Sequence, residues 1–236
     1  MFTSGTKRLV DEEFNRMVPF LEENKPDVLK RLDECSQDLQ IAMKFLYSAM
    51  PVSDVADYDF GTFQDFAEHA LFLRKNVSWC ADVPDDIFLN YVLYHRINNE
   101  DIRECRKFFY RHIYERVSDM SMKEAALEVN YWCAEHVTYR STDIRTASPL
   151  AVWNAGFGRC GEESTFTVTA LRSIGIPARQ IYAPRWSHCD DNHAWVEAWC
   201  DGKWHFMGAC EPEPVLDLGW FIEPATRAMF IHNRTF

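Results

Sequence analysis

The sequence predicts an α+β protein, in which a helical N-terminal region of residues 1–118 precedes a core of residues 119–236 that combines helices with antiparallel strands. Three observations predict this class. Apolar residues recur at helical spacing through the first half of the chain. Near residue 138, Gly, Pro, Trp and β-branched residues become common. Asp201-Gly202, between two alternating segments, is a strong signal for a two-residue β-hairpin.

The first half is predicted to be a series of helices, with Pro26 and Pro51 as breaks between them. Their apolar faces follow the i, i+3, i+4 spacing that buries one side of a helix. No motif in this half indicates a function. We expect helices over residues 11–23, 27–50, 63–75, 85–96 and 101–117.

The core begins with a helix and continues into strands. Ser121 followed by Glu124 is a capping box, and it predicts a helix from Ser121 to about Val137. Ser148-Pro149 predicts a short helical turn that runs through residue 153. A longer helix is expected over residues 160–174. Alternating segments predict strands over residues 179–186, 193–200 and 203–207, and a strand-like run covers residues 227–235.

Composition limits the classes of function. Lys plus Arg number 25 and Asp plus Glu 36, a formal charge of -11, which disfavours nucleic acid and anionic membrane surfaces as partners. We expect no signal peptide and no membrane-spanning segment, because the first 20 residues and the rest of the chain hold no long apolar run. The 8 cysteines form no C-x-x-C pair, so we expect reduced thiols and a cytoplasmic location.

Cys160 is the candidate nucleophile. It lies in Gly158-Arg159-Cys160-Gly161, just before an apolar-periodic segment that Gly175 and Pro177 terminate. The predicted helix therefore begins at or near Cys160, where unpaired N–H groups and the helix dipole favour a thiolate and should lower the thiol pKa. The thiolate is the reacting form of cysteine, and the Cys160 N–H could serve as an oxyanion donor. Most cysteines are buried structural residues, but this setting favours a nucleophile.

His193 is the candidate base. Along the predicted strand, His193, Trp195 and Glu197 alternate with Ala194, Val196, Ala198 and Cys200, so the two sets point to opposite faces. The small and apolar set should face the core or the helix, and His193 opens the strand on the aromatic face. A histidine there can take the thiol proton and return it to a leaving group. A packed or surface histidine is the simpler alternative, and the cysteine motif argues against it.

Together these motifs resemble the transglutaminase-like superfamily, in particular its bacterial-type domains. The family pattern is a Gly-x-Cys-Gly start, a helix, a Gly-Ile-Pro-Ala-Arg turn, a His-Ala-Trp-Val-Glu strand and a Gly-x-Trp hairpin. This chain has all five, at residues 158–161, 160–174, 175–179, 193–197 and 202–204, in the same order and at similar spacing. The resemblance covers about residues 120–220. It implies a papain-like fold with a Cys-His-Asp triad, no cofactor, and acyl transfer or hydrolysis at an amide of a peptide or protein through a thioester, with Cys160 as nucleophile and His193 as base.

The third triad member does not carry over. The family places Asp four residues after the hairpin Trp, and Gly208 stands there in this chain. Hairpin register, counted outward from the Asp201-Gly202 turn, pairs His193 with Cys210 and makes Gly208 its diagonal neighbour. Glu211 is the nearest acid along the chain, and a bulge could swing it onto the right face. Asp217, Asp190 and Asp191 are further candidates, as is a Cys-His dyad with a backbone or water orienter.

Several other residues are weaker candidates. Trp153, Trp186 and Trp195 could line a substrate groove, with core packing as the alternative, and Asn154 could donate to an oxyanion or merely cap a turn. His, Cys and Asp residues between 188 and 210 crowd together, but they match no standard zinc spacing, so we expect no metal. Two alternatives stay open: a catalytically degenerate module that binds peptides, for which Gly208 is the best argument, and a metal-binding module. The chain could also be the front of a longer protein with further domains.

Overall fold

The computed structural model describes residues 1–143 and 145–233, and the fold is α+β as predicted. Its contacts divide the chain into two compact units, residues 1–95 and residues 96–235. The second unit therefore includes α8 (Arg106–Val117), which the sequence assigns to the helical region. The domain boundary at 118/119 stays a prediction.

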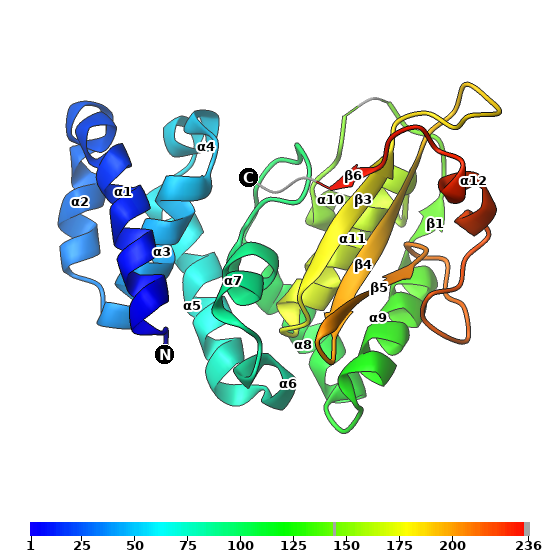
Figure 1. Cartoon of the computed structure of the whole chain (residues 1–236), viewed down its shortest axis with the longest axis horizontal. Coiled ribbons are helices and arrows are strands. Elements are labelled where there is room, and N and C mark those ends of the chain that lie inside the picture. The colour runs from blue at the N-terminus through cyan, green and yellow to red at the C-terminus, as the bar shows by residue number, and fades with distance from the viewer. Residues whose placement is uncertain (144, 234–236) are drawn as a thin grey trace. The chain divides into compact units, whose positions relative to one another are not determined.

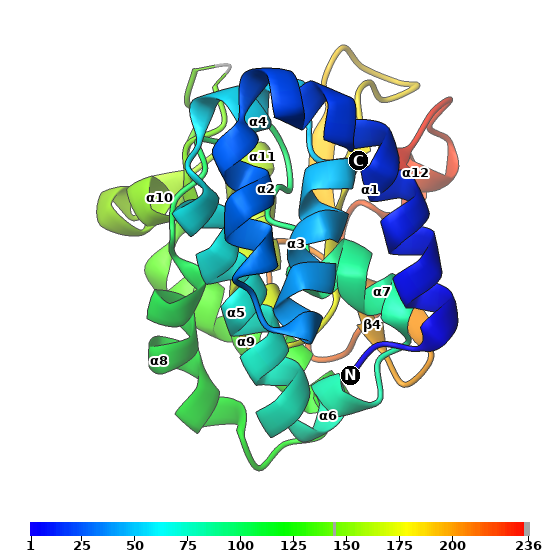
Figure 2. The same ribbon diagram turned by 90° about the vertical axis from the view of Figure 1, so that its left-hand side faces the viewer.

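The first unit is entirely helical, and Figure 2 shows three of its helices, α1, α2 and α3, lying side by side. Its core is built from buried apolar side chains, among them Leu21, Met43, Leu46, Phe63 and Leu73. Its elements are α1 (Ser4–Asn24), α2 (Pro26–Asp33), α3 (Gln37–Ala49), α4 (Val52–Asp57), α5 (Phe60–Asn76), α6 (Ser78–Ala81), α7 (Asp85–Phe88) and a π-helix, η1 (Leu89–Leu93).

One prediction of a single helix in this region is wrong, and a second is right only in part. The span 27–50 is two helices, because the chain turns at residues 34–36 and Ser36 takes an extended conformation ahead of α3. The apolar spacing continues across the turn, so the pattern did not reveal the break. The span 85–96 is α7 followed by η1, and the chain leaves the helix at Tyr94. In addition, α1 begins at Ser4, capped by Thr3, well before residue 11.

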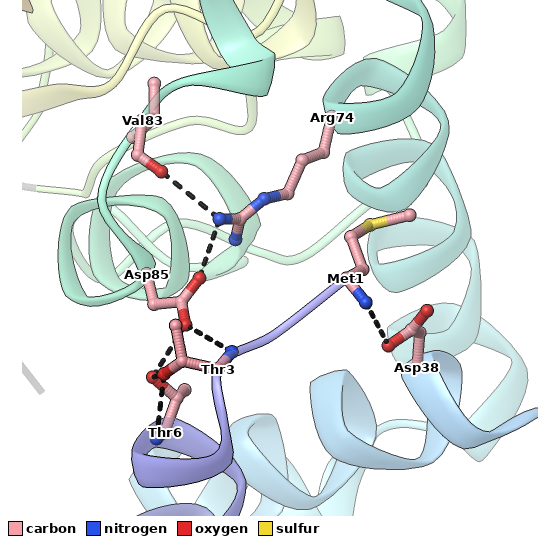
Figure 3. A network of polar contacts seen from close by, with 7 residues as sticks. All are labelled: Met1, Thr3, Thr6, Asp38, Arg74, Val83 and Asp85. Carbon is pink, nitrogen blue, oxygen red and sulfur yellow. Dashed lines mark hydrogen bonds and ion pairs between the residues drawn. The ribbon is translucent and has the colours of Figure 1, made fainter.

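A polar network closes the first unit around Asp85 (Figure 3). The Asp85 carboxylate accepts hydrogen bonds from the Thr3 N–H (2.9 Å), the Thr6 hydroxyl (2.7 Å) and the Arg74 guanidinium (2.6 Å). Arg74 also donates to the Val83 carbonyl. These contacts hold the pKa of Asp85 below its ordinary value, against the effect of burial. The start of α1 is thereby fixed to the start of α7.

The second unit is a sheet with helices packed on it (Figure 1). Four strands run in the antiparallel order β5-β4-β3-β6, and β1 and β2 form a separate parallel pair. The remaining elements are α9 (Met122–His136), β1 (Thr138–Tyr139), α10 (Pro149–Ala155), β2 (Phe157–Gly158), α11 (Cys160–Ser173), β3 (Ala178–Ala183), β4 (His193–Cys200), β5 (Lys203–Met207), α12 (Ile222–Thr226) and β6 (His232–Asn233).

The α9, α11, β4 and β5 predictions are confirmed to within a residue or two, and the Ser121–Glu124 capping box is present. The helix expected over 101–117 begins only at Arg106. The strand expected over 179–186 ends at Ala183. Of the strand-like run over 227–235, residues 232 and 233 form β6, and residues 234–235 lie outside the described residues.

Helix α11 is the centre of this unit, since every residue from Gly161 to Ser173 is buried. It contacts α8, α9 and α10 as well as strands β3 and β4. Several of its hydroxyl groups are satisfied within the helix, because those of Ser164, Thr165, Thr167 and Ser173 donate to carbonyls four residues earlier. A helix of this composition can therefore be buried at low cost in unmet hydrogen bonds.

The side chains of β4 alternate between two faces of the sheet, as predicted. Ala194, Val196 and Ala198 are buried on the face that packs on α11. The other face carries His193 and Trp195, opposite Ala183 and Ile181 of β3. This second face forms a core cluster with the C-terminal segment through Phe221, which is 1% exposed. No helix in the described residues is both long and apolar enough to cross a membrane.

Candidate active site

Cys160 is the first residue of α11, and the loop before it is fixed by Glu162. The buried Glu162 carboxylate accepts from the Arg159 N–H (3.0 Å), the Thr142 hydroxyl (2.7 Å) and the Ala147 N–H (3.1 Å). Gly158 is required by this arrangement, since a Cβ there would lie 2.8 Å from the Glu162 Cβ. The motif thus holds the helix start in place.

The Cys160 thiol has a raised pKa, which corrects the expectation of a lowered one. Burial raises the pKa, and nearby Glu163 adds to the effect. The Ala194 N–H, the Arg159 charge and the Gly161 N–H oppose it without reversing it. The helix N-terminus does favour the thiolate as expected, but the cost of burying a charge is larger here.

His193 opens β4 and lies in an aromatic pocket. Its ring centroid is 4.7 Å from that of Trp220, 5.1 Å from Phe221 and 6.1 Å from both Trp186 and Trp195. Burial lowers the pKa of His193 to about 4, and Asp191 opposes this shift only weakly. Within the described part of the chain, the buried Nε2 atom has no hydrogen-bond partner. The imidazole is therefore neutral at physiological pH.

The structure brings Cys160 and His193 together through the backbone. The backbone N–H of Ala194, the residue after His193, lies near enough to the Cys160 thiol to lower its pKa. Among the residues described, no hydrogen bond joins the thiol to the imidazole, so the expected direct contact is not made in this state. Catalytic hydrogen bonds are often long in ligand-free structures and tighten when substrate binds.

The hairpin of β4 and β5 has the predicted register only up to Val196–Met207. Beyond it the chain reverses in a tight turn, with Gly208 bridging to Glu211 and Cys210 at φ 56°. The predicted pairing of His193 with Cys210 is therefore wrong, because residues 209 and 210 form the turn instead of extending the strand. This turn carries Glu211 back over Gly208.

Glu211 occupies the space that a side chain at position 208 would fill. A Cβ on Gly208 would lie 2.8 Å from Glu211 Oε2 and 2.9 Å from its Cβ. The Glu211 carboxyl accepts a hydrogen bond from Trp220 Nε1 at 2.9 Å. Burial raises the pKa of Glu211, and the Trp220 bond partly offsets this. A carboxyl thus stands beside the position of the family Asp, although its observed partner is Trp220, and its role as third member stays a prediction.

The other acids considered have different partners. The Asp217 carboxylate bonds His205 Nδ1 at 2.7 Å and the Phe206 N–H at 3.0 Å. Exposed Asp190 pairs with Arg185 at 3.3 Å. Asp191 is the acid whose charge acts on His193, and its backbone carbonyl accepts from the Trp186 N–H. These contacts leave Glu211 as the acid placed at position 208.

Three residues near the site were not identified from the sequence. Asn130 clamps the 208–211 turn by donating to the Gly208 carbonyl (2.7 Å) and accepting from the Cys210 N–H (2.9 Å). Glu163, one helical turn after Cys160, has its pKa raised to about 8 by burial and by the neighbouring Glu211 and Glu162. Tyr139 is exposed, and Cys160 is among the groups that raise its pKa. Only Glu163 had a usable signal, its i+3 spacing from Cys160.

A cavity of 160 Å³ lies next to the start of α11, since Arg159 and Gly161, the neighbours of Cys160 in the chain, line it. Gly161 and Ala194, which flank the thiol contact, are part of its wall. Gln180 contributes an amide that is fixed by hydrogen bonds to the Gly161 carbonyl and the Ser164 hydroxyl. The rest of the wall is polar: Asn98, Asn99, Thr146, Arg159, Tyr182 and His232. There is room here for a small hydrogen-bonding group of a substrate.

The four predicted substrate-binding residues lie in three places. Trp186 and Trp195 are buried around His193. Trp153 is half-buried and stacks on Trp132, with ring centroids 5.5 Å apart. Asn154 is exposed and lines a separate cavity of 740 Å³. In the described residues, no three His, Cys, Asp or Glu side chains are grouped to hold a metal ion, so the 188–210 cluster offers no ligand set there.

A known protein family matches the part of the chain that holds Cys160 and His193. Residues 111–209, from α8 to the 208–211 turn, match the Transglutaminase-like superfamily. The chain carries a domain of the transglutaminase-like superfamily. The match includes Cys160, His193 and Gly208 but ends before Glu211 and Trp220. No curated protein matches the chain in sequence.

Among solved structures, this transglutaminase-like chain is similar to the crystal structure of a "Putative Cysteine Protease" from Cytophaga hutchinsonii. The two share 20% sequence identity with a TM-score of 0.45, and the similarity covers 68% of this chain and 55% of that one. The chain thus spans little more than half the length of that protein. The match of residues 111–209 to this superfamily indicates thiol-dependent chemistry in general.

Proposed function

We propose that this protein is a cysteine acyltransferase or hydrolase that acts on an amide of a peptide or protein, with Cys160 as nucleophile and His193 as base. The observation that carries the proposal is the contact between the Cys160 thiol and the Ala194 N–H. It brings the first residue of α11 to the start of strand β4, whose first residue is His193. Peptide substrates and a cytoplasmic location are part of the same proposal.

The proposed reaction begins from a neutral pair, because burial raises the thiol pKa and lowers the imidazole pKa. As the Cys160 sulfur attacks the amide carbonyl, its proton passes to His193 and the carbonyl electron pair moves onto oxygen. The tetrahedral adduct then collapses to a thioester. The amine leaves with the proton that His193 had received, so charge and protons balance.

The second half of the reaction releases the acyl group. Water or a primary amine attacks the thioester carbonyl, His193 takes its proton, and the thiol is restored. The Cys160 N–H, in the first turn of α11 where helix N–H groups have no partner within the helix, is the proposed oxyanion donor. The 160 Å³ cavity next to the start of α11 is the proposed site for the polar group next to the reacting amide.

A second candidate function is a peptide-binding module without catalysis. It is favoured by one specific observation, the lack of a hydrogen-bond partner for His193 Nε2 in the described part of the structure. A carboxylate on that nitrogen normally holds the imidazole in the useful orientation and tautomer. The two candidates differ in whether a covalent acyl group ever forms on Cys160.

An activated ester separates these candidates without knowledge of the substrate. With p-nitrophenyl acetate we expect a burst of nitrophenolate and an acetyl group on Cys160, detected by mass spectrometry of the digested protein. Cys160→Ser should abolish the burst, and His193→Gln should slow it by about 10²-fold or more. Cys189→Ser is the matched control, since Cys189 is exposed and outside the site. A burst that survives Cys160→Ser would reject the proposal.

Transferase and hydrolase are then distinguished by the fate of the acyl group. Incubation with a peptide library and a tagged primary amine, with wild type and with Cys160→Ser, gives tagged peptides for a transferase and untagged cleaved or deamidated products for a hydrolase. The balance depends on how well the site excludes water from the thioester.

A further inference from the structure

The imidazole of His193 lacks the usual means of orientation. No described residue bonds its Nε2, and the position from which the family supplies a carboxylate is Gly208. What surrounds the ring is aromatic: Trp186, Trp195 and Phe221, all buried, and Trp220. Contacts with these aromatic rings must therefore hold the imidazole in its orientation, as a hydrogen bond to Nε2 does in other members of the family.

Trp220 differs from the other three rings in two ways. It is nearest to the imidazole, with centroids 4.7 Å apart and planes tilted by 53°, a favourable aromatic geometry. It is also 58% exposed, which is unusual for tryptophan, so core burial does not explain its placement. Its Nε1–H donates a hydrogen bond to the Glu211 carboxyl at 2.9 Å.

The backbone around Trp220 is anchored independently of its own side chain. The next residue, Phe221, is 1% exposed and stacks on Trp195 with centroids 4.9 Å apart. Gly219 lets the Phe221 ring lie against the chain, since a Cβ there would be 2.7 Å from that ring. Trp220 is thus held at its backbone by Phe221 and at its indole tip by Glu211.

We propose that Trp220 is the positioning residue for His193, and that Glu211 acts on the imidazole through the Trp220 indole instead of bonding it directly. The proposal rests on the proposed function and identifies how a site with glycine at position 208 keeps its base aligned. Gly208 leaves space that the Glu211 side chain fills. Glu211 then holds the Trp220 indole by a hydrogen bond. The Trp220 ring in turn packs against the imidazole of His193.

This chain of contacts makes a specific prediction about combined substitutions. Trp220→Phe keeps a ring over His193 but removes the N–H, and Glu211→Leu removes the acceptor while keeping bulk. Each should slow the p-nitrophenyl acetate burst by about ten- to a hundredfold, because a misplacement of about 1 Å in a catalytic group can cost about 10²-fold. The double variant should be no slower than either single variant, since both break the same link.

A second readout follows the imidazole itself. Trp220→Ala uncovers the ring, so the pKa of His193, followed by NMR, should rise from about 4 towards the value of about 6.5 for an exposed histidine. The acids that act on the ring from the elements around it are Asp191, and Glu211 by way of Trp220. Trp199→Phe is the matched control, because Trp199 lies on the same strand as His193 and packs edge to face against Trp204 instead.

Two results would overturn the inference. One is a Glu211→Leu effect that persists undiminished when Trp220 is already Phe, which would mean that Glu211 acts directly on His193. The other is a burst rate and a His193 pKa that Trp220→Ala leaves unchanged. Failure of the proposed function would give a different result, because His193→Gln would then leave the burst as fast as in the wild type. The Trp220 and Glu211 variants would in that case show no loss of rate to compare.

Discussion

Replacing Gly208 with alanine tests whether Glu211 fills the position of the missing carboxylate. Gly208 is buried and its backbone is not in the left-handed region, so alanine brings no backbone strain. Its Cβ would, however, lie 2.8 Å from Glu211 Oε2, 2.9 Å from Glu211 Cβ and 3.2 Å from the Glu211 carbonyl oxygen. The Glu211 side chain would have to move away, and with it the bond to Trp220.

Opposing effects determine how much Gly208→Ala changes the free energy of unfolding. Alanine in place of glycine restricts the unfolded chain and stabilises the fold by about 0.4–1 kcal/mol where the backbone permits. Overpacking a filled site costs about 1–3 kcal/mol, and loss of the Glu211–Trp220 hydrogen bond about 0.5–1.5 kcal/mol. The steric cost is larger, so Gly208→Ala should lower the free energy of unfolding by about 1–3 kcal/mol.

The sign of the effect should depend on Glu211. In a Glu211→Gly background both close side-chain contacts are gone and only the 3.2 Å contact with the backbone oxygen is left. There the same alanine should be neutral or slightly stabilising, a coupling of at least about 1 kcal/mol.

Urea unfolding followed by tryptophan fluorescence measures this coupling, because all tryptophans except Trp79 lie within residues 96–235. A matched substitution, Gly61→Ala, meets no atom within 4 Å and should not destabilise the fold through steric contacts. An equal penalty for Gly208→Ala with and without the Glu211 side chain would refute the reasoning, and so would no penalty at all in the wild type.

Three further predictions concern groups around the site. His193 has a pKa of about 4 in the folded protein and about 6.5 in the unfolded chain. It therefore contributes about 3 kcal/mol of stability above pH 6.5, which is lost as the pH falls towards 4. His193→Gln should flatten that part of the plot of stability against pH. The effect of Glu163 on stability has the opposite sign, because its pKa is raised to about 8 and stability falls as the pH rises from about 4.5 to 8. The stability of Glu163→Gln should therefore match that of the wild type near pH 4.5 and exceed it by up to about 4 kcal/mol above pH 8. Asn130→Ala should cost about 2–4 kcal/mol in urea unfolding because it strands two buried backbone groups, whereas Asn24→Ala, which removes one exposed bond, should cost less than about 0.5 kcal/mol.

The parts of the fold that the sequence predicted well are those governed by local rules. β4 and β5 have the predicted bounds because strict alternation and the Asp201-Gly202 turn fix register over a short distance. The start of α9 follows from its capping box. Cys160 is the first residue of α11 because the motif glycine makes room for Glu162.

The parts that were missed depend on contacts between distant segments. The register count past Met207 failed because Cys210 adopts φ 56°, which is uncommon for a residue other than glycine and has no sequence signal here. The thiol pKa was predicted from the helix N-terminus alone, whereas burial by the rest of the unit decides its direction. Trp220 lies outside the family match and reaches His193 only through the fold.

The raised thiol pKa and the lowered imidazole pKa have one consequence for the chemistry. In the proposed reaction, a site whose two partners are both neutral holds no stored thiolate, so proton transfer would accompany the attack on the carbonyl. The orientation of the imidazole then limits the rate more than the acidity of the thiol does. Because Nε2 has no acceptor among the described residues, that orientation depends on the surrounding rings. Substitutions that disturb the rings should therefore lower acylation more than substitutions of charges around Cys160.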